Sequence, residues 1–172
     1  MRRRNGSNGG MTDALPGPAS HTLISQRLRL NYVDWGNPDA PPLVLVHGGQ
    51  DHCRNWDWVA GDLRRDYHVI APDLRGHGDS DWIGAGGYYH YMDYVADLDD
   101  VIARMARKRV IVVGHSMGGG VAAYWAGTRP DRLHGLALLE GLGPPDQSEV
   151  ELGGRTAQWL DALVVQQRRE GA

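Results

Sequence analysis

A pentapeptide at residues 114–118, Gly-His-Ser-Met-Gly, has the composition and spacing of a reactive serine. It follows the apolar run 109–113, which predicts a buried strand, and precedes small residues that predict a helix at 117–127. A sharp strand-to-helix turn exposes the hydroxyl of Ser116, and the flanking glycines leave room for it. The amide of Met117, at the helix start, can donate to a developing oxyanion. The sequence therefore predicts Ser116 as a nucleophile with a positive φ and Met117 as an oxyanion-hole donor.

A second motif follows another predicted strand. The uninterrupted apolar run 43–46 ends in His-Gly-Gly-Gln at 47–50, and glycines there let a backbone N–H face the serine. We expect Gly49 to be the second oxyanion-hole donor. A third motif at 72–80, Pro-Asp-Leu-Arg-Gly-His-Gly-Asp-Ser, follows the strand expected at 67–71 and by itself indicates a polar turn.

The order and spacing of these three motifs resemble the α/β-hydrolase fold family, in its single-domain, esterase-like branch. Tyr-Val-Asp-Trp-Gly at 32–36 resembles the early hairpin of that family, and the resemblance extends from residue 23 to residue 145. It implies a serine hydrolase that acts on a carboxylic ester or related acyl compound. Epoxide hydrolases and dehalogenases share this fold but use aspartate at the nucleophile elbow, the strand-to-helix turn that here carries Ser116, so Ser116 argues against both. Carbon–carbon bond hydrolases and cofactor-free haloperoxidases also use serine and stay open as alternatives.

Alternating strands and helices independently predict an α/β fold, with a mainly parallel sheet and flanking helices. The other elements that we expect are a hairpin at 21–35, helices at 56–65 and 91–106, a strand at 133–139 and a helical segment within 150–169. On helix 91–106 the apolar spacing leaves Asp97, Asp99 and Asp100 facing water. We expect residues 1–20 to be a disordered tail, 21–145 the hydrolase-like core, and 146–172 a helical segment that begins a cap.

Serine attack needs a general base, usually a histidine oriented by a carboxylate. The resemblance implies that this histidine follows the final strand and that the acid follows the seventh or, in some members, the sixth. Strand 133–139 counts as the sixth, and the sequence has no histidine after His134. We therefore expect an incomplete fold in which the histidine base is absent. Glu140, at the end of that strand, is the candidate acid, and an exposed strand-end carboxylate is the simpler alternative.

Some remaining polar residues lie at the edge of the sheet where parallel strands end, which is the edge of Ser116. The histidines at this edge are His47, His52, His77 and His90. Each is a candidate substitute base, but loop histidines with local hydrogen bonds are the simpler interpretation. Asp73 and Asp79 are alternative carboxylates that turn capping explains more simply. Cys53 has a claim to be a reactive thiol, although an ordinary loop residue is the simpler interpretation.

The bulk properties exclude several classes of function. A net charge of −3 gives no sign of a nucleic-acid surface, and a single cysteine fits a reducing compartment. We expect a cytoplasmic protein with no membrane span, because no apolar stretch approaches the required length. Neither metal-ligand spacing nor a nucleotide-binding glycine motif is present, so we expect no metal and no cofactor.

Two functions remain for the chain. The first is a serine hydrolase that is weakly active or inactive without its histidine. The second is a non-catalytic or truncated family member that binds a small ligand or a partner. In both cases we expect the apolar edge at 133–139 to promote self-association.

Overall fold

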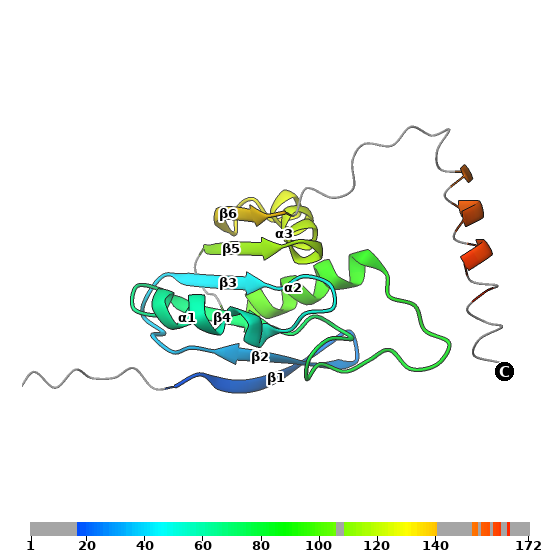
Figure 1. Cartoon of the computed structure of the whole chain (residues 1–172). Helices are drawn as coiled ribbons and strands as arrows, with labels where there is room; N and C mark the ends of the chain where they lie inside the picture. The colour runs from blue at the N-terminus through cyan, green and yellow to red at the C-terminus, as the bar shows by residue number, and fades with distance from the viewer. Residues whose placement is uncertain are drawn as a thin grey trace, which may run out of the picture. The chain divides into compact units, whose positions relative to one another are not determined.

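The computed structural model describes residues 17–105 and 109–140, and scattered residues between 153 and 165. The chain divides into two compact units, residues 1–142 and 143–172, and the sheet lies in the first. The strands are β1 (Ala19–Ser25), β2 (Leu28–Asp34), β3 (Pro42–Val46), β4 (His68–Pro72), β5 (Val110–His115) and β6 (Leu133–Leu139) (Figure 1). The helices are the short η1 (Cys53–Trp56), α1 (Asp57–Leu63), α2 (Tyr91–Met105) and α3 (Met117–Thr128). Most of the predicted segment 150–169 lies outside the described residues.

The six strands form one sheet in the order β1-β2-β4-β3-β5-β6. β1 and β2 form an antiparallel hairpin, and β2 pairs with β4 in the antiparallel direction. The strands β4, β3, β5 and β6 run parallel to one another. The prediction of a mainly parallel sheet with flanking helices is confirmed. Because parallel strands point the same way, the loops that leave β3, β4, β5 and β6 gather at one edge of the sheet.

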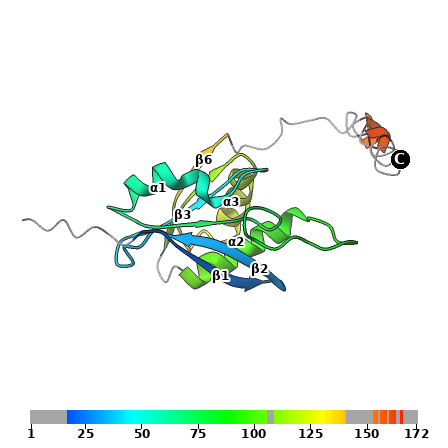
Figure 2. The ribbon, with the colours of Figure 1, turned by 60° about the horizontal axis from the view of Figure 1, so that its bottom comes forward.

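Helices cover both faces of the sheet, and the buried residues of β3 divide between them. Val44 and Val46 pack with α2 and α3, whereas Leu43 and Leu45 pack on the opposite face with Ala60 of α1. Figure 2 shows α1 and α2 on opposite sides of the strands. A strand covered on both faces needs apolar residues at every position, which is why β3 is an uninterrupted apolar run.

One prediction about α2 was wrong. Asp97 does not face water but is 2% exposed, and it accepts hydrogen bonds from Arg75 Nε (2.6 Å) and Arg75 Nη2 (2.8 Å). Ser25 Oγ of β1 donates to the same carboxylate at 2.7 Å. A buried charge is tolerated when it is paired and hydrogen-bonded, and here the pair ties α2 to β1 and to the loop after β4. The partner comes from a distant part of the chain, so helical spacing gave no sign of it.

We expect Asp97→Ala to lower the free energy of unfolding by about 3 kcal/mol, at the lower end of the range for breaking a buried ion pair, because the buried Arg75 guanidinium loses Asp97 but keeps its ion pair with Asp93 at 3.1 Å. Asp62→Ala is the matched control. Its ion pair with Arg65 is 3.9 Å long, and the Asp62 side chain is 85% exposed, so the loss should be about 0–1 kcal/mol. Urea denaturation of both variants checks this, and equal losses would contradict the role of the buried pair.

Among the described residues, β6 is an edge strand that pairs only with β5. Leu136 and Leu139 on this strand are 37% and 45% exposed. An apolar edge of this kind exposes backbone N–H and C=O groups to any strand that can pair with them.

We expect the chain of residues 1–172 to form oligomers or aggregates in light scattering, and Leu136→Lys to reduce them. Val59→Lys, at a 47% exposed position on α1, is the control that adds the same charge away from the edge. A monodisperse monomer with a cooperative melt would contradict this prediction.

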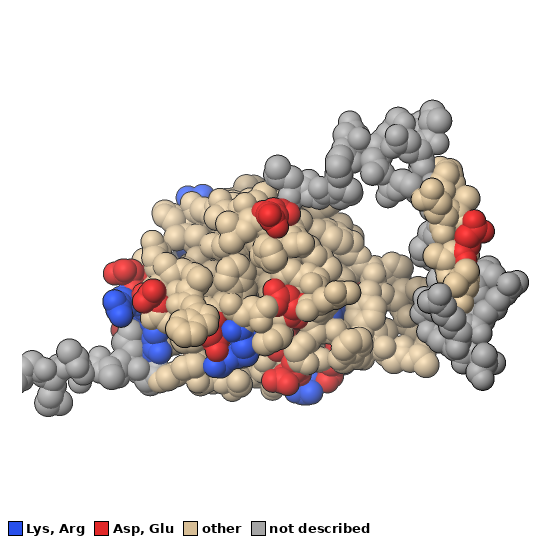
Figure 3. All heavy atoms as spheres, viewed as in Figure 1, with Lys and Arg blue, Asp and Glu red and all other residues tan. Residues whose placement is uncertain are grey.

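On the face shown in Figure 3, acidic and basic residues are interspersed, and most of the described surface is uncharged. This face presents no broad field of one sign. Within the described residues, no helix has both the length and the apolar character needed to cross a membrane.

Candidate active site

Ser116 occupies the turn between β5 and α3 with φ +50° and ψ −118°. The predicted positive φ is confirmed, and such a conformation is uncommon in a residue other than glycine and concentrates at functional sites. The turn is held on both sides. Ser116 N–H donates to the carbonyl of Leu139 at 2.8 Å, and its own carbonyl accepts from the amides of Gly119 and Gly120 at 3.0 and 3.2 Å. The side chain itself is exposed.

Two glycines of the pentapeptide are needed for this close approach of helix and sheet. A Cβ on Gly118 would overlap the carbonyl oxygen of His47 and lie 2.7 Å from that of Val46. A Cβ on Gly114 would lie 2.5 Å from the carbonyl oxygen of Gly118. Since the obstacles are backbone atoms, α3 reaches the end of β3 only without side chains at these positions.

The loop after β3 passes beside the start of α3. A Cβ on Gly48 would lie 3.3 Å from Ser116 Cβ, and a Cβ on Gly49 would lie 3.9 Å from Met117 Sδ. The fold thus brings the two predicted oxyanion-hole residues, Gly49 and Met117, to the neighbourhood of Ser116 from separate loops.

Glu140 lies next to the elbow in the sheet, because the preceding residue, Leu139, accepts the hydrogen bond from Ser116 N–H. Its backbone has φ +55°, and its side chain is 89% exposed. Glu140 Oε2 lies 4.0 Å from His115 Nε2. The candidate acid is therefore at the predicted edge, where His115 lies within ion-pair distance of it.

His47 has no free ring nitrogen. It is fully buried, its Nδ1 donates to the carbonyl of Gly48 at 2.7 Å, and Leu74 N–H donates to its Nε2 at 2.9 Å. Burial lowers the pKa of His47, which favours this neutral form. The ring joins the loop after β3 to the loop after β4, so His47 is a structural residue.

The other histidines at this edge have local partners. His77 Nδ1 donates to the carbonyl of Arg75 at 3.0 Å, which leaves Nε2 as its acceptor in the neutral ring. His52 Nδ1 accepts from the backbone of η1 at 3.3 Å, and the ring of His90 lies 6.2 Å from that of Tyr88. Within residues 17–105 and 109–140, no side chain hydrogen-bonds to Ser116 Oγ.

Asp73 organises the turn after β4, which agrees with the simpler interpretation of this residue. Its carboxylate accepts from Cys53 N–H (2.6 Å), Asn31 Nδ2 (2.8 Å) and Asp79 N–H (2.9 Å). Burial alone would raise the pKa of Asp73, but these hydrogen bonds outweigh it and lower the pKa. Cys53 is 2% exposed, and burial raises the pKa of its thiol, which disfavours a reactive thiolate. It is the first residue of η1 rather than an ordinary loop residue.

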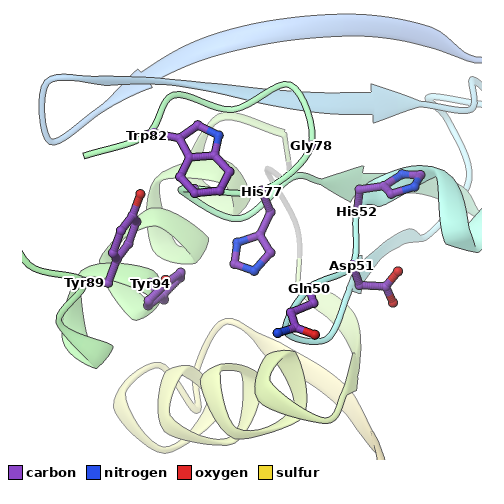
Figure 4. Close-up of a pocket in the computed structure, with 9 residues that line it drawn as sticks. Gln50, Asp51, His52, His77, Gly78, Trp82, Tyr89 and Tyr94 are labelled. Carbon is purple, nitrogen blue, oxygen red and sulfur yellow. The ribbon is translucent and has the colours of Figure 1, made fainter. Parts of the chain in front are cut away.

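A cavity of about 600 Å³ opens beside the loops after β3 and β4. Figure 4 shows its lining residues, which are Gln50, Asp51, His52, Gly76, His77, Gly78, Trp82, Tyr89 and Tyr94. The sequence motifs did not predict that aromatic residues line this cavity. The cluster of tyrosines between residues 88 and 94 is the feature of the sequence that could have indicated it. Among the described residues, no group of three or more His, Cys, Asp or Glu is placed to hold a metal ion.

A family model described as the alpha/beta hydrolase fold matches residues 41–163. The chain belongs to the α/β hydrolase fold family. A 3-hydroxybutyrate-oligomer hydrolase of Cupriavidus necator is 38% identical over 117 residues, which are 67% of this chain and 40% of that protein. A serine hydrolase-like protein of Homo sapiens is 31% identical over 106 residues, which are 62% of this chain and 52% of that protein.

Solved structures of α/β hydrolases agree with the fold. The thioesterase domain from the curacin biosynthetic pathway is 29% identical, with a TM-score of 0.73, over 84% of this chain and 52% of that domain. The chain spans 40% of the length of the Cupriavidus relative, and also 40% of a probable serine hydrolase of Drosophila melanogaster.

Proposed function

We propose that this chain supplies the nucleophile and the oxyanion hole of a serine hydrolase that acts on a carboxylic ester or a related acyl compound. The observation that supports it most is the exposed Ser116 with φ +50° between β5 and α3. Strain at an exposed serine, held by backbone hydrogen bonds on both sides, serves to present a hydroxyl.

In the proposed reaction Ser116 Oγ attacks the carbonyl carbon of the substrate. A C–O bond forms, the carbonyl oxygen becomes an oxyanion, and the amides of Gly49 and Met117 donate to it. Collapse expels the alcohol and leaves an acyl-serine, which water hydrolyses. The proton of Ser116 must leave during attack. In the proposal it goes to a histidine that Glu140 orients, and that histidine passes it to the departing alkoxide oxygen, which leaves as the alcohol.

Residues 1–172 have no histidine after His134, and no described side chain hydrogen-bonds to Ser116 Oγ. These observations favour slow catalysis by residues 1–172 alone. The lack of a described hydrogen-bond partner for Ser116 Oγ also supports a second candidate function, in which the chain is a non-catalytic family member that only binds a small ligand or a partner.

Fluorophosphonate labelling followed by intact-mass measurement separates the two candidates. We expect slow modification of Ser116 and little or no turnover of a p-nitrophenyl ester, since no described side chain accepts the Ser116 proton but the oxyanion hole still contributes. Ser116→Ala should abolish labelling, whereas Ser20→Ala, at an exposed serine on β1, should leave it unchanged. Absence of labelling at high probe concentration would overturn the proposed nucleophile. Robust turnover would show that a base is present, and loss of that turnover in His77→Ala would identify it.

A further inference from the structure

The cavity begins within one residue of the proposed oxyanion hole. Gln50, which lines it, directly follows Gly49, and Gly76, His77 and Gly78 line it from the loop after β4. Its volume of about 600 Å³ falls within the range that small-molecule sites occupy, roughly 300–1,000 Å³.

One side of the cavity is an aromatic wall, which we define as Trp82, Tyr89 and Tyr94 (Figure 4). The two tyrosines of the wall are held in place before any ligand arrives. Tyr89 Oη accepts from Ile83 N–H at 3.0 Å, and the ring of Tyr89 stacks on that of Tyr94 at 6.3 Å with 23° between the planes. A side chain at residue 76 would displace the wall, because a Cβ on Gly76 would lie 2.6 Å from Tyr89 Cε1.

The aromatic wall leaves ring surface uncovered. Trp82 is 69% exposed and Tyr89 is 41% exposed, whereas Tyr94 is buried. Aromatic rings prefer offset or edge-to-face contact with a second ring, and such a pair is more favourable than its buried area alone predicts. A ligand with an aromatic ring should therefore bind to this wall more tightly than an aliphatic ligand of equal size.

The charges of the lining exclude one class of ligand. None of the nine lining residues is Lys or Arg. A carboxylate or phosphate on the ligand would lose hydration here without gaining a cationic partner.

We propose that this cavity binds an uncharged, ring-bearing part of the acyl substrate and that Trp82 determines the preference for a ring. The assignment to a substrate rests on the proposed function of Ser116, but binding of the ring does not require the serine hydroxyl.

The test is binding of three matched probes by isothermal titration calorimetry at pH 8, above the ordinary titration range of histidine. The probes are 2-phenylacetamide, 2-cyclohexylacetamide and phenylacetate, which differ in the ring or in the charge alone. We expect 2-phenylacetamide to bind about fivefold more tightly than each of the others. Trp82→Ala should reduce that binding about fivefold and remove the preference for the phenyl ring, while Trp82→Phe should retain it.

Trp58→Ala is the matched control, because Trp58 is 91% exposed on α1 and is not among the lining residues. Equal affinity for the three probes, or the same loss in Trp58→Ala as in Trp82→Ala, would overturn the inference. Ser116→Ala should bind 2-phenylacetamide like the unmodified chain. Probe selectivity without fluorophosphonate labelling would overturn the proposed function and the assignment to an acyl substrate, but would leave the ring preference of the cavity standing. Labelling without probe selectivity would overturn the cavity inference and leave the proposed function standing.

Discussion

Adding a C-terminal segment that carries a glycine–histidine loop should raise Ser116-dependent hydrolysis of a p-nitrophenyl ester by about 10²–10⁴-fold over residues 1–172. The reason is the proton on Ser116 Oγ. No described side chain accepts it, and a protonated hydroxyl is a weak nucleophile near neutral pH. An added imidazole at the sheet edge of Ser116 and Glu140 would take that proton as the C–O bond forms.

The decisive control is the same extension with its histidine replaced by alanine, which keeps any gain in folding but removes the base. Ser116→Ala in the extended chain should be about as inactive as the histidine variant, because nucleophile and base act as a unit. Equal activity of the histidine and alanine extensions, with matching thermal melts by circular dichroism, would contradict the proposed role of a histidine base.

The sequence predicted the framework of the site because local patterns determine it. β6 runs from Leu133 to Leu139 as predicted, and the start of α3 at Met117 also matches. Apolar runs specify buried strands, and glycines at 114 and 118 specify the turn, since backbone atoms occupy the space that a Cβ would need.

Contacts between distant parts of the chain could not be predicted in the same way. Helical spacing placed Asp97 on the water-facing side of α2. It could not show that Arg75, from the loop after β4, pairs with this carboxylate and buries it. Tyr94 has the spacing of a core residue on α2, and nothing in that spacing indicates that it stacks with Tyr89 beside a cavity. His47 was one of several candidate bases until its two ring hydrogen bonds excluded it. Each of these assignments depends on tertiary geometry rather than on residue type or period.

The elbow should be intolerant of a single methyl group. We expect Gly118→Ala to lower the free energy of unfolding by about 3 kcal/mol, at the upper end of overpacking effects, because the new Cβ meets the carbonyl groups of Val46 and His47 rather than yielding side chains. Relief of that overlap requires α3 to move away from β3, which also moves Met117 and Ser116 relative to Gly49. A displacement of about 1 Å is enough to cost roughly 100-fold in rate, so fluorophosphonate labelling of Ser116 should fall by a similar factor.

Gly127→Ala, in the last turn of the same helix, is the matched control for Gly118→Ala. A Cβ on Gly127 has no neighbouring atom within 4 Å, so the substitution should stabilise α3 by about 0.5–1 kcal/mol through its higher helix propensity. Urea denaturation and the labelling rate of Ser116 are measured for both variants. We expect the free energy of unfolding to fall in Gly118→Ala and to rise in Gly127→Ala, and we expect labelling to be lost only in Gly118→Ala. Both variants introduce the same alanine, so the difference comes from the backbone carbonyl groups that face residue 118 and are absent near residue 127. If Gly118→Ala matched Gly127→Ala in both measurements, the close approach of α3 to β3 could not be what positions Ser116.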